Sequence, residues 1–182
     1  MAKTGGLVHT QYEEILRCCQ TKERVMNIEY YRTRENAEAP RRAYPSDAGM
    51  DLAFAPENDG ELTVEPGCSV LCQTGLKFGV PHGYMLQIMN RSSVAAKRSL
   101  IVGAHVVDAG YNGEVFINLH NVGTETQIIT PGDRIAQAVL IPVIHVTPEE
   151  YHSDDLYSRA YVESRRGAGA LGSTDRKQQC NK

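Results

Sequence analysis

Short runs of β-branched and aromatic residues alternate with turn sequences along most of the chain. Glycine-containing triplets at 58–60, 81–83, 111–113 and 131–133 punctuate these runs. Runs of about four to eight such residues, bounded by Gly, Pro, Asn and Asp, are typical of strands in sandwiches and barrels. The pattern predicts strands over 27–31, 50–55, 61–64, 68–73, 76–80, 84–90, 100–107, 114–121, 125–129 and 135–145. We therefore expect an all-β protein, either a sandwich or a jelly-roll-like barrel.

Two segments have a helical pattern instead. Residues 93–98 form one short internal helix candidate, because Val-Ala-Ala-Lys-Arg follows a serine pair that is able to cap its start. Residues 11–25 place apolar side chains at i, i+3, i+4 and i+7 from Tyr12, which is typical of a short amphipathic helix. Residues 1–25 are thus interpreted as an N-terminal helical extension, either an added arm or an upstream extension of the reading frame.

The C-terminal part of the chain has a different composition. Residues 147–159 are polar and acidic, and residues 161–174 are rich in glycine. Their apolar content is too small for independent packing, so such a tail needs another surface to order it. The sequence therefore predicts a barrel domain over 26–160 and a flexible tail over 161–182.

Composition and charge narrow the class of protein. With 182 residues, 41% of them hydrophobic, the chain is long enough for one domain with its own core. Its net charge of −3 offers no basic excess for binding nucleic acid. No apolar run approaches the roughly 20 residues of a membrane span, and residues 1–10 lack the apolar block of a secretory signal. We expect a cytoplasmic protein with neither a nucleic-acid nor a membrane partner.

The five cysteines are odd in number and lack Cys-x-x-Cys spacing. Reduced thiols fit this pattern better than a disulfide framework or a zinc site. No pair of histidines has the i, i+4 spacing of metal ligands on a helix. The sequence therefore offers no dedicated metal cage.

Three segments carry groups suited to binding or activating an anion. The tail at 165–174 combines guanidinium groups, hydroxyls and unobstructed backbone N–H groups, although an incidental glycine-rich terminus is the alternative. The NRSS sequence at 90–93 ends a strand and precedes the short helix, so it either holds an anion or caps the helix. Asp108 follows an apolar strand and enters a turn, where a carboxylate is either a turn former or a base.

These segments belong to a set of five motifs that occur in one fixed order. The set is DAGMDLA (47–53), NRSSVA (90–95), VVDAGYNGE (106–114), PGDRIAQAV (131–139) and RRGAGALGST (165–174). With this order the chain resembles the trimeric dUTPase family over about residues 26–175. Five ordered motifs are far more specific than any one of them.

The resemblance implies a jelly-roll-like β-barrel that assembles as a homotrimer, with three active sites built from motifs of different subunits. The tail would then cross to a neighbouring subunit and close over the substrate. The implied reaction is hydrolysis of dUTP to dUMP and pyrophosphate, in which water attacks the α-phosphorus. Mg²⁺ is the implied cofactor, held through substrate phosphates and water rather than directly by the protein. Such an enzyme limits uracil incorporation into DNA and supplies dUMP for thymidylate synthesis.

The resemblance also assigns roles to individual positions. Asp108 corresponds to the acid that orients and deprotonates the attacking water, and Tyr111 to the aromatic residue beneath the deoxyribose, which excludes a 2′-hydroxyl. Asp51 corresponds to a carboxylate that supports Arg91 or the water shell of the metal. Uracil is expected to be read by backbone groups of a hairpin that leads to Asp108. The other expected substrate contacts are Arg91, Ser92, Ser93, Gln137, Val102, Val106 and Val107 in the barrel, and Arg166, Leu171, Gly172, Ser173 and Thr174 on the tail.

Three positions depart from the family pattern. Leu171 stands where the family usually has a phenylalanine that stacks on uracil, and such stacking is typically worth about 1–3 kcal/mol. Ala170 replaces a common glycine in the same loop. His105 stands where the dUTPase pattern has glycine, whereas the related dCTP deaminases carry Ala-His there, as in Ala104 and His105.

Alternatives to the dUTPase assignment are a deaminase, a pyrophosphatase with relaxed specificity for deoxynucleoside triphosphates, and a non-catalytic nucleotide-binding regulator. Deamination requires a glutamate on the strand after the turn, and the matching position is Asn118, which cannot perform acid–base chemistry. The deaminase pattern also has an arginine where this chain has Ala96. The presence of Asp108 and Tyr111 argues against a purely regulatory protein.

Overall fold

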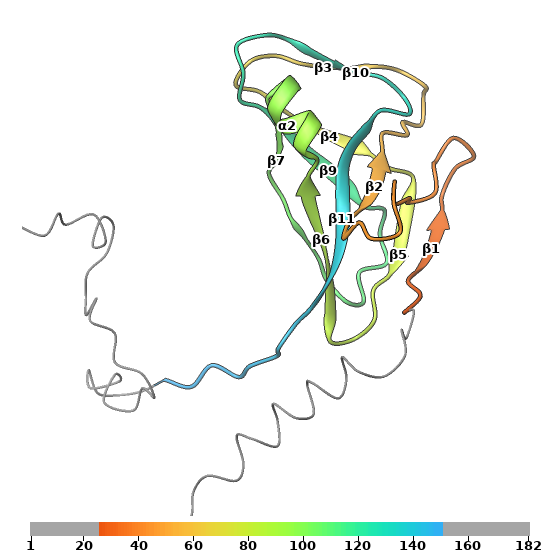
Figure 1. The fold of residues 1–182 in the computed structure, drawn as a ribbon, viewed down its shortest axis with the longest axis vertical. Coiled ribbons are helices and arrows are strands. Elements are labelled where there is room, and N and C mark those ends of the chain that lie inside the picture. The colour runs from red at the N-terminus through yellow and green to blue at the C-terminus, as the bar shows by residue number, and fades with distance from the viewer. Residues whose placement is uncertain (1–25, 151–182) are drawn as a thin grey trace, which may run out of the picture. The chain divides into compact units, whose positions relative to one another are not determined.

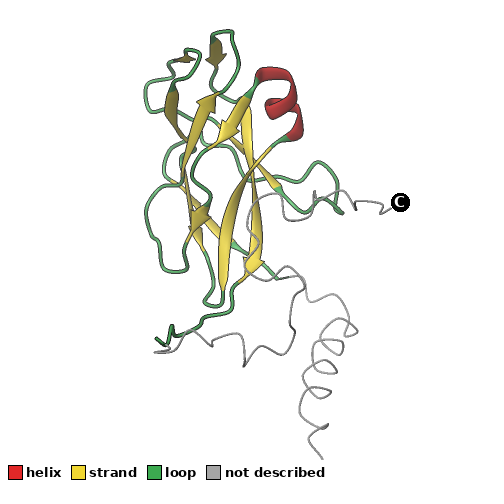
Figure 2. Cartoon of the chain, turned by 90° about the vertical axis from the view of Figure 1, so that its left-hand side faces the viewer, coloured by secondary structure: helices red, strands yellow, loops and turns green. Residues whose placement is uncertain are grey.

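The computed structural model of the chain describes residues 26–150, which form antiparallel strands and one short helix (Figures 1 and 2). The prediction of an all-β, jelly-roll-like fold is confirmed. The elements are β1 (Glu29–Arg32), β2 (Met50–Ala53), β3 (Leu62–Val64), β4 (Ser69–Gln73), β5 (Leu76–Gly79), β6 (Tyr84–Asn90), α2 (Ser92–Arg98), β7 (Leu100–Val102), β8 (Val106–Val107), β9 (Phe116–Asn121), β10 (Gln127–Ile129) and β11 (Arg134–Pro142).

The chain divides into two units, residues 1–144 and 145–182. Of the second unit, residues 145–150 are described, and they are exposed and carry no regular secondary structure. The predicted helical extension over 1–25 and the predicted tail over 161–182 lie outside the described residues, so the proposed domain limits stay predictions. No helix within 26–150 has the length and apolar character needed to cross a membrane.

Two larger sheets form the barrel wall, with the strand orders β2-β11-β6-β8 and β4-β9-β7. Two further pairs, β1-β5 and β10-β3, complete the described strands. β11 lies between β2 and β6 (Figure 1), and its register places Gln137 opposite Asp51 on one side and opposite Met89 on the other. Three segments that are distant in sequence therefore meet along one strand.

The core follows from the two-residue alternation of the strands. In β9, Ile117 and Leu119 are fully buried, whereas Phe116 is exposed on the other face. Burial of an aliphatic side chain of this size contributes roughly 1.5–3 kcal/mol. The largest fully buried apolar side chains come from strands of all four sheets and from the residue directly after β2: Phe54, Leu52, Leu76, Leu86, Ile88, Leu100, Ile117, Leu119, Ile129, Ile135 and Val64.

The strand expected over 100–107 is two strands in the structure, and this prediction was wrong. β7 pairs with β9, whereas β8 pairs with β6, so residues 103–105 cross from one sheet to the other. A Cβ atom on Gly103 would lie 2.2 Å from His120 Nε2, and the Gly103 N–H donates to the Asn118 carbonyl at 2.9 Å. The prediction of a hairpin that leads to Asp108 is also wrong, because β7 and β8 lie in different sheets and are not paired with each other.

Two cysteines, Cys68 and Cys72, lie in the described residues, and both are free thiols. Cys72 is fully buried in the core. Burial raises the pKa of the Cys72 thiol from 9.0 to about 12. Cys72 therefore packs as a small apolar side chain and stays protonated at neutral pH.

Asn121 is a buried polar residue that ties the turn after β9 to β3. Its side-chain amide donates to the carbonyls of Val64 at 2.8 Å and Glu125 at 2.7 Å, and its Oδ1 accepts from the Gly123 N–H at 3.0 Å. The residue is 1% exposed. All three partners would lose their bonds if the side chain were removed.

We predict that Asn121→Ala lowers the free energy of unfolding by about 2–4 kcal/mol, because buried backbone groups lose their partners. Urea denaturation with a constant m-value would measure this loss. Asn58→Ala, at an exposed position, serves as the control and should change stability by less than about 0.5 kcal/mol. Equal stability of the two variants would contradict the anchoring role.

Candidate active site

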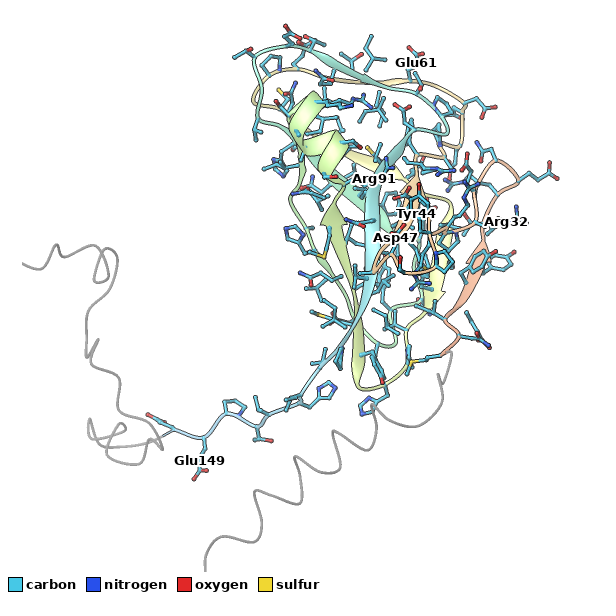
Figure 3. The ribbon with its side chains drawn as sticks, viewed as in Figure 1. Arg32, Tyr44, Asp47, Glu61, Arg91 and Glu149 are labelled. Atoms are coloured by element: carbon cyan, nitrogen blue, oxygen red, sulfur yellow. The ribbon has the colours of Figure 1, made fainter. Side chains whose placement is uncertain are left out.

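A polar pocket of about 290 Å³ lies where β2, β6 and β11 meet the start of α2. Asp47, labelled below Arg91 in Figure 3, also lines this pocket. The pocket brings together these residues that the sequence singled out: Asp51, Arg91, Ser92, Ser93 and Gln137. They come from three of the five ordered motifs.

Asp51 holds the Arg91 guanidinium in place. Arg91 Nε donates to Asp51 Oδ1 at 2.7 Å, and Arg91 Nη1 donates to the Arg134 carbonyl at 2.7 Å. Arg134 Nη1 lies 3.6 Å from Asp51 Oδ2, so both carboxylate oxygens face a guanidinium. Among the described residues nothing accepts from Arg91 Nη2, which leaves this donor available to an anion. Charge-assisted contacts of this kind fix the orientation of a guanidinium group.

Gln137 and Asn90 connect the pocket to the neighbouring sheet. Gln137 Nε2 donates to the Asn90 carbonyl at 2.9 Å, and Asn90 Oδ1 accepts from the Val102 N–H at 2.6 Å. Gly49 lies against the Gln137 side chain, because a Cβ atom there would fall 2.1 Å from Gln137 Oε1. The position of Gln137 therefore depends on the absence of a side chain at residue 49.

The two serines do not cap the helix, contrary to the capping alternative. α2 begins at Ser92, the N-cap residue is Arg91 in an extended conformation, and no side chain caps the helix. Ser92 and Ser93 are exposed and line the pocket instead. The serine pair was one residue too late in the chain to occupy the N-cap position.

Asp108 and Tyr111 lie on the loop between β8 and β9. Asp108 is exposed, and no described residue donates a hydrogen bond to its carboxylate. Its carbonyl accepts from the Tyr111 N–H at 3.2 Å, and the Tyr111 hydroxyl donates to the Glu114 carbonyl at 2.9 Å. Tyr111 lines a different pocket of about 420 Å³, bordered by β1 and β5. Neither residue lines the Arg91 pocket within a single chain.

The remaining expected contacts fall into two groups. Val102 and Val107 are buried, Val106 is exposed, and the Val102 N–H is already bonded to Asn90. The residues expected on the tail lie outside the described residues: Arg166, Leu171, Gly172, Ser173 and Thr174. Their roles stay predictions.

Sequence reasoning missed several residues that shape the pocket. Asn90, Arg134 and Gly49 each belong to a quoted motif, but none was given a role. Motif membership was the available signal, since Asn90 directly precedes Arg91 and Gly49 lies two residues before Asp51. Their functions depend on contacts across strands, which spacing along the chain does not show.

Comparison with known proteins finds relatives along most of the chain. The dUTPase family model matches residues 35–174. The deoxyuridine 5′-triphosphate nucleotidohydrolase of Syntrophotalea carbinolica is 35% identical over 153 residues, which is 83% of this chain and 98% of that protein. Its counterpart from Desulfitobacterium hafniense is 38% identical over 152 residues, which is 82% of this chain and 95% of that protein.

Solved structures share the fold. A mutant dUTPase from phage phi11 of S. aureus, described with a coordinated structural Mg(II) ion, is 25% identical and has a TM-score of 0.64, covering 70% of this chain and 98% of its own. A mutant dUTPase of Staphylococcus bacteriophage 80alpha with dUpNHpp is 24% identical and has a TM-score of 0.69, covering 81% of this chain and 98% of its own. This chain is thus similar to these proteins over almost their full lengths.

We predict that Gly49→Ala weakens binding of inorganic triphosphate about five- to tenfold, because the new methyl group displaces the Gln137 amide from the pocket. The thermal unfolding temperature should change little, since the two atoms closest to the new methyl group, Gln137 Oε1 and Cδ, lie at the end of a flexible side chain. Isothermal titration calorimetry would measure the affinity. Gly60→Ala is the matched control, because the nearest atom to a Cβ there is 3.9 Å away. Unchanged affinity of Gly49→Ala would remove Gln137 from the anion site.

Proposed function

The chain belongs to the dUTPase family, and from this membership and the geometry of its polar pocket we propose that it hydrolyses dUTP to dUMP and pyrophosphate. The observation that carries the proposal is the Arg91 guanidinium, fixed by Asp51 beside two exposed serine hydroxyls and Gln137. The products imply a role in lowering cellular dUTP and in supplying dUMP for thymidylate synthesis.

We assign the pocket to the phosphate groups of the substrate. Arg91 Nη2 and the hydroxyls of Ser92 and Ser93 donate no hydrogen bond to any of the described residues, so they are available to a bound phosphate. Fixed donors stabilise the charge that moves onto phosphate oxygens during phosphoryl transfer without reorganising. In a protein of net charge −3 this positive field must be local. Arg166, Ser173 and Thr174 on the tail are proposed to add further phosphate contacts.

Asp108 is proposed as the general base. Its carboxylate is exposed and accepts no hydrogen bond from residues 26–150, so it can accept a proton from a water molecule as the water oxygen forms a bond to the α-phosphorus. The bond from the α-phosphorus to its bridging oxygen breaks, and pyrophosphate leaves with the electron pair. Tyr111, held by its hydroxyl against the Glu114 carbonyl, is proposed to lie beneath the deoxyribose and to exclude a 2′-hydroxyl.

The proposed site is shared between subunits of a homotrimer. The pocket with Arg91 and the loop with Asp108 are separate features of one chain, and Tyr111 lines a pocket on the β1–β5 side. A catalytic site that needs both sets is incomplete in a single subunit. Assembly of identical chains in a closed ring supplies the missing set to each subunit.

The described residues fit a Mg²⁺ ion that is held mainly by the substrate. No three of their His, Cys, Asp and Glu side chains gather as metal ligands, and both Asp51 oxygens face arginines. Mg²⁺ keeps several water ligands and commonly needs few protein groups. When bound to the triphosphate, the ion supplies positive charge to the phosphate oxygens, and Arg91 adds to that charge from the protein side.

The deaminase alternative is not favoured by the structure around Asn118. Its Oδ1 lies 2.6 Å from His120 Nε2, and its carbonyl accepts from the Gly103 N–H. An amide in this place offers no carboxyl group that could move protons to and from a cytosine ring. The exposed carboxylate of Asp108 equally argues against a purely regulatory protein.

The substrate assignment predicts a strong preference for dUTP. In steady-state assays with Mg²⁺ and, in turn, dUTP, dCTP, dTTP and UTP, pyrophosphate release should be fastest by kcat/KM with dUTP. A preference of at least about 100-fold over UTP is expected from steric exclusion at Tyr111. Ammonia release from dCTP would overturn the proposal in favour of deamination.

The shared site predicts complementation between inactive variants. Asp108→Asn should lower kcat by about 10²- to 10⁴-fold with little change in nucleotide affinity, because the base is lost and the phosphate contacts remain. Arg91→Ala should lower kcat/KM through weaker phosphate binding. Co-expression of the two variants in equal amounts should restore activity in about one quarter of the sites, since random mixing unites the intact residues in that fraction. No recovery in the mixed oligomer would place the complete site in one chain.

A further inference from the structure

Arg34 and Glu114 form a partly buried ion pair at the end of the loop that carries Asp108 and Tyr111. Arg34 Nη1 and Nη2 donate to the two Glu114 carboxylate oxygens at 3.1 and 2.5 Å. Their side chains are 14% and 13% exposed. Glu114 Oε1 also accepts from the Gly75 N–H at 2.8 Å, and Arg34 Nη1 donates to the Ala55 carbonyl at 2.6 Å. The pair therefore joins the loop to three other segments of the barrel.

The same residue, Glu114, holds the Tyr111 ring. The Tyr111 hydroxyl donates to the Glu114 carbonyl, so the side chain folds back over Gly113, where a Cβ atom would lie 2.3 Å from the hydroxyl oxygen. The next residue, Val115, has hydrogen bonds that do not involve the ion pair. Its N–H donates to the carbonyl of Leu76 in β5, and its carbonyl accepts from the hydroxyl of Thr74 in the turn before β5. Loss of the ion pair should thus shift the loop without unfolding the barrel.

We propose that Arg34 and Glu114 are positioning residues that set sugar discrimination by fixing the Tyr111 ring. This inference rests on the proposed function, in which Tyr111 packs beneath the deoxyribose. A bidentate pair defines both the position and the orientation of Glu114, and through its carbonyl the position of the tyrosine hydroxyl. Displacement of the ring opens the space in which a 2′-hydroxyl would otherwise clash. Neither Arg34 nor Glu114 lines the Arg91 pocket, so phosphate binding is spared.

The test compares Glu114→Gln and Arg34→Gln with Arg98→Gln. Arg98 is the matched control, because it also contacts a carboxylate, that of Asp133 at 3.1 Å, and a carbonyl, that of Ile128 at 2.5 Å. None of its side-chain partners belongs to the 108–114 loop. The measured quantity is the ratio of kcat/KM for UTP to that for dUTP, together with hydrogen–deuterium exchange of the peptide over 108–116.

Glu114→Gln and Arg34→Gln should each raise the UTP to dUTP ratio about three- to tenfold and speed exchange in the loop peptide. The double variant should raise the ratio no further than either single variant, because the two residues act as one unit.

Arg98→Gln should lower the unfolding temperature and leave the ratio and the loop exchange unchanged. Arg34→Lys keeps the charge but not the bidentate geometry, so a smaller shift in the same direction is expected, and it replaces Arg34→Gln if that variant does not fold.

Failure of this inference and failure of the proposed function give different results. An unchanged ratio and unchanged loop exchange, in a wild-type enzyme that prefers dUTP, overturn the positioning role alone. If the wild-type protein does not hydrolyse dUTP, the proposed function fails. Faster loop exchange confined to Arg34→Gln and Glu114→Gln would then still support the anchoring of Tyr111, while unchanged exchange would overturn that as well.

Discussion

Backbone hydrogen bonds along both edges of β11 hold together three segments that are far apart in the sequence. Pairing with β2 brings Asp51 beside Gln137, and pairing with β6 brings Asn90 and the following Arg91 to the same place. The Asp51 carboxylate then orients Arg91, and the Gln137 amide bonds to the Asn90 carbonyl. The polar pocket is thus a consequence of strand register, since a shift by one residue would turn Gln137 and Asp51 to opposite faces.

The sequence was most informative where a local pattern determines structure. Short β-branched and aromatic runs between turn sequences predicted strands such as β6 and β9. Which side chains of these strands point inward was not predicted, and the structure shows it for Ile117 and Leu119. The same reasoning failed for the apolar run from Leu100 to Val107. The residues on both sides of the crossing are apolar, because each of the two strands contributes to the core. Composition therefore cannot show that the chain passes from one sheet to the other at Gly103.

For the candidate site, too, the sequence predicted which residues take part more completely than it predicted their contacts. Asp51, Arg91, Ser92, Ser93 and Gln137 were found from ordered motifs, and the structure brings them into one pocket. Support of Arg91 by Asp51 was one of two roles expected for this carboxylate, and the two side chains are in contact. The other contacts that fix the positions of these residues were not predicted. The Asn90 side chain bonds to Val102 across twelve positions, and Arg34 bonds to Glu114 across 80 positions. Such pairs leave no periodic signal in a single sequence, because their spacing depends on the whole topology.

The crossing between the sheets also limits how the length of this chain can vary. β8 has only two residues, with Val106 exposed and Val107 buried. It is joined to β7 by three residues whose ends are fixed, since Gly103 bonds to Asn118 and the His105 ring and backbone both bond to Ile88. A deletion or insertion here would exchange the inward and outward valines and move Asp108 along the barrel edge. Natural length variation among relatives should therefore collect in other connections, such as the 56–61 segment, and spare this three-residue link.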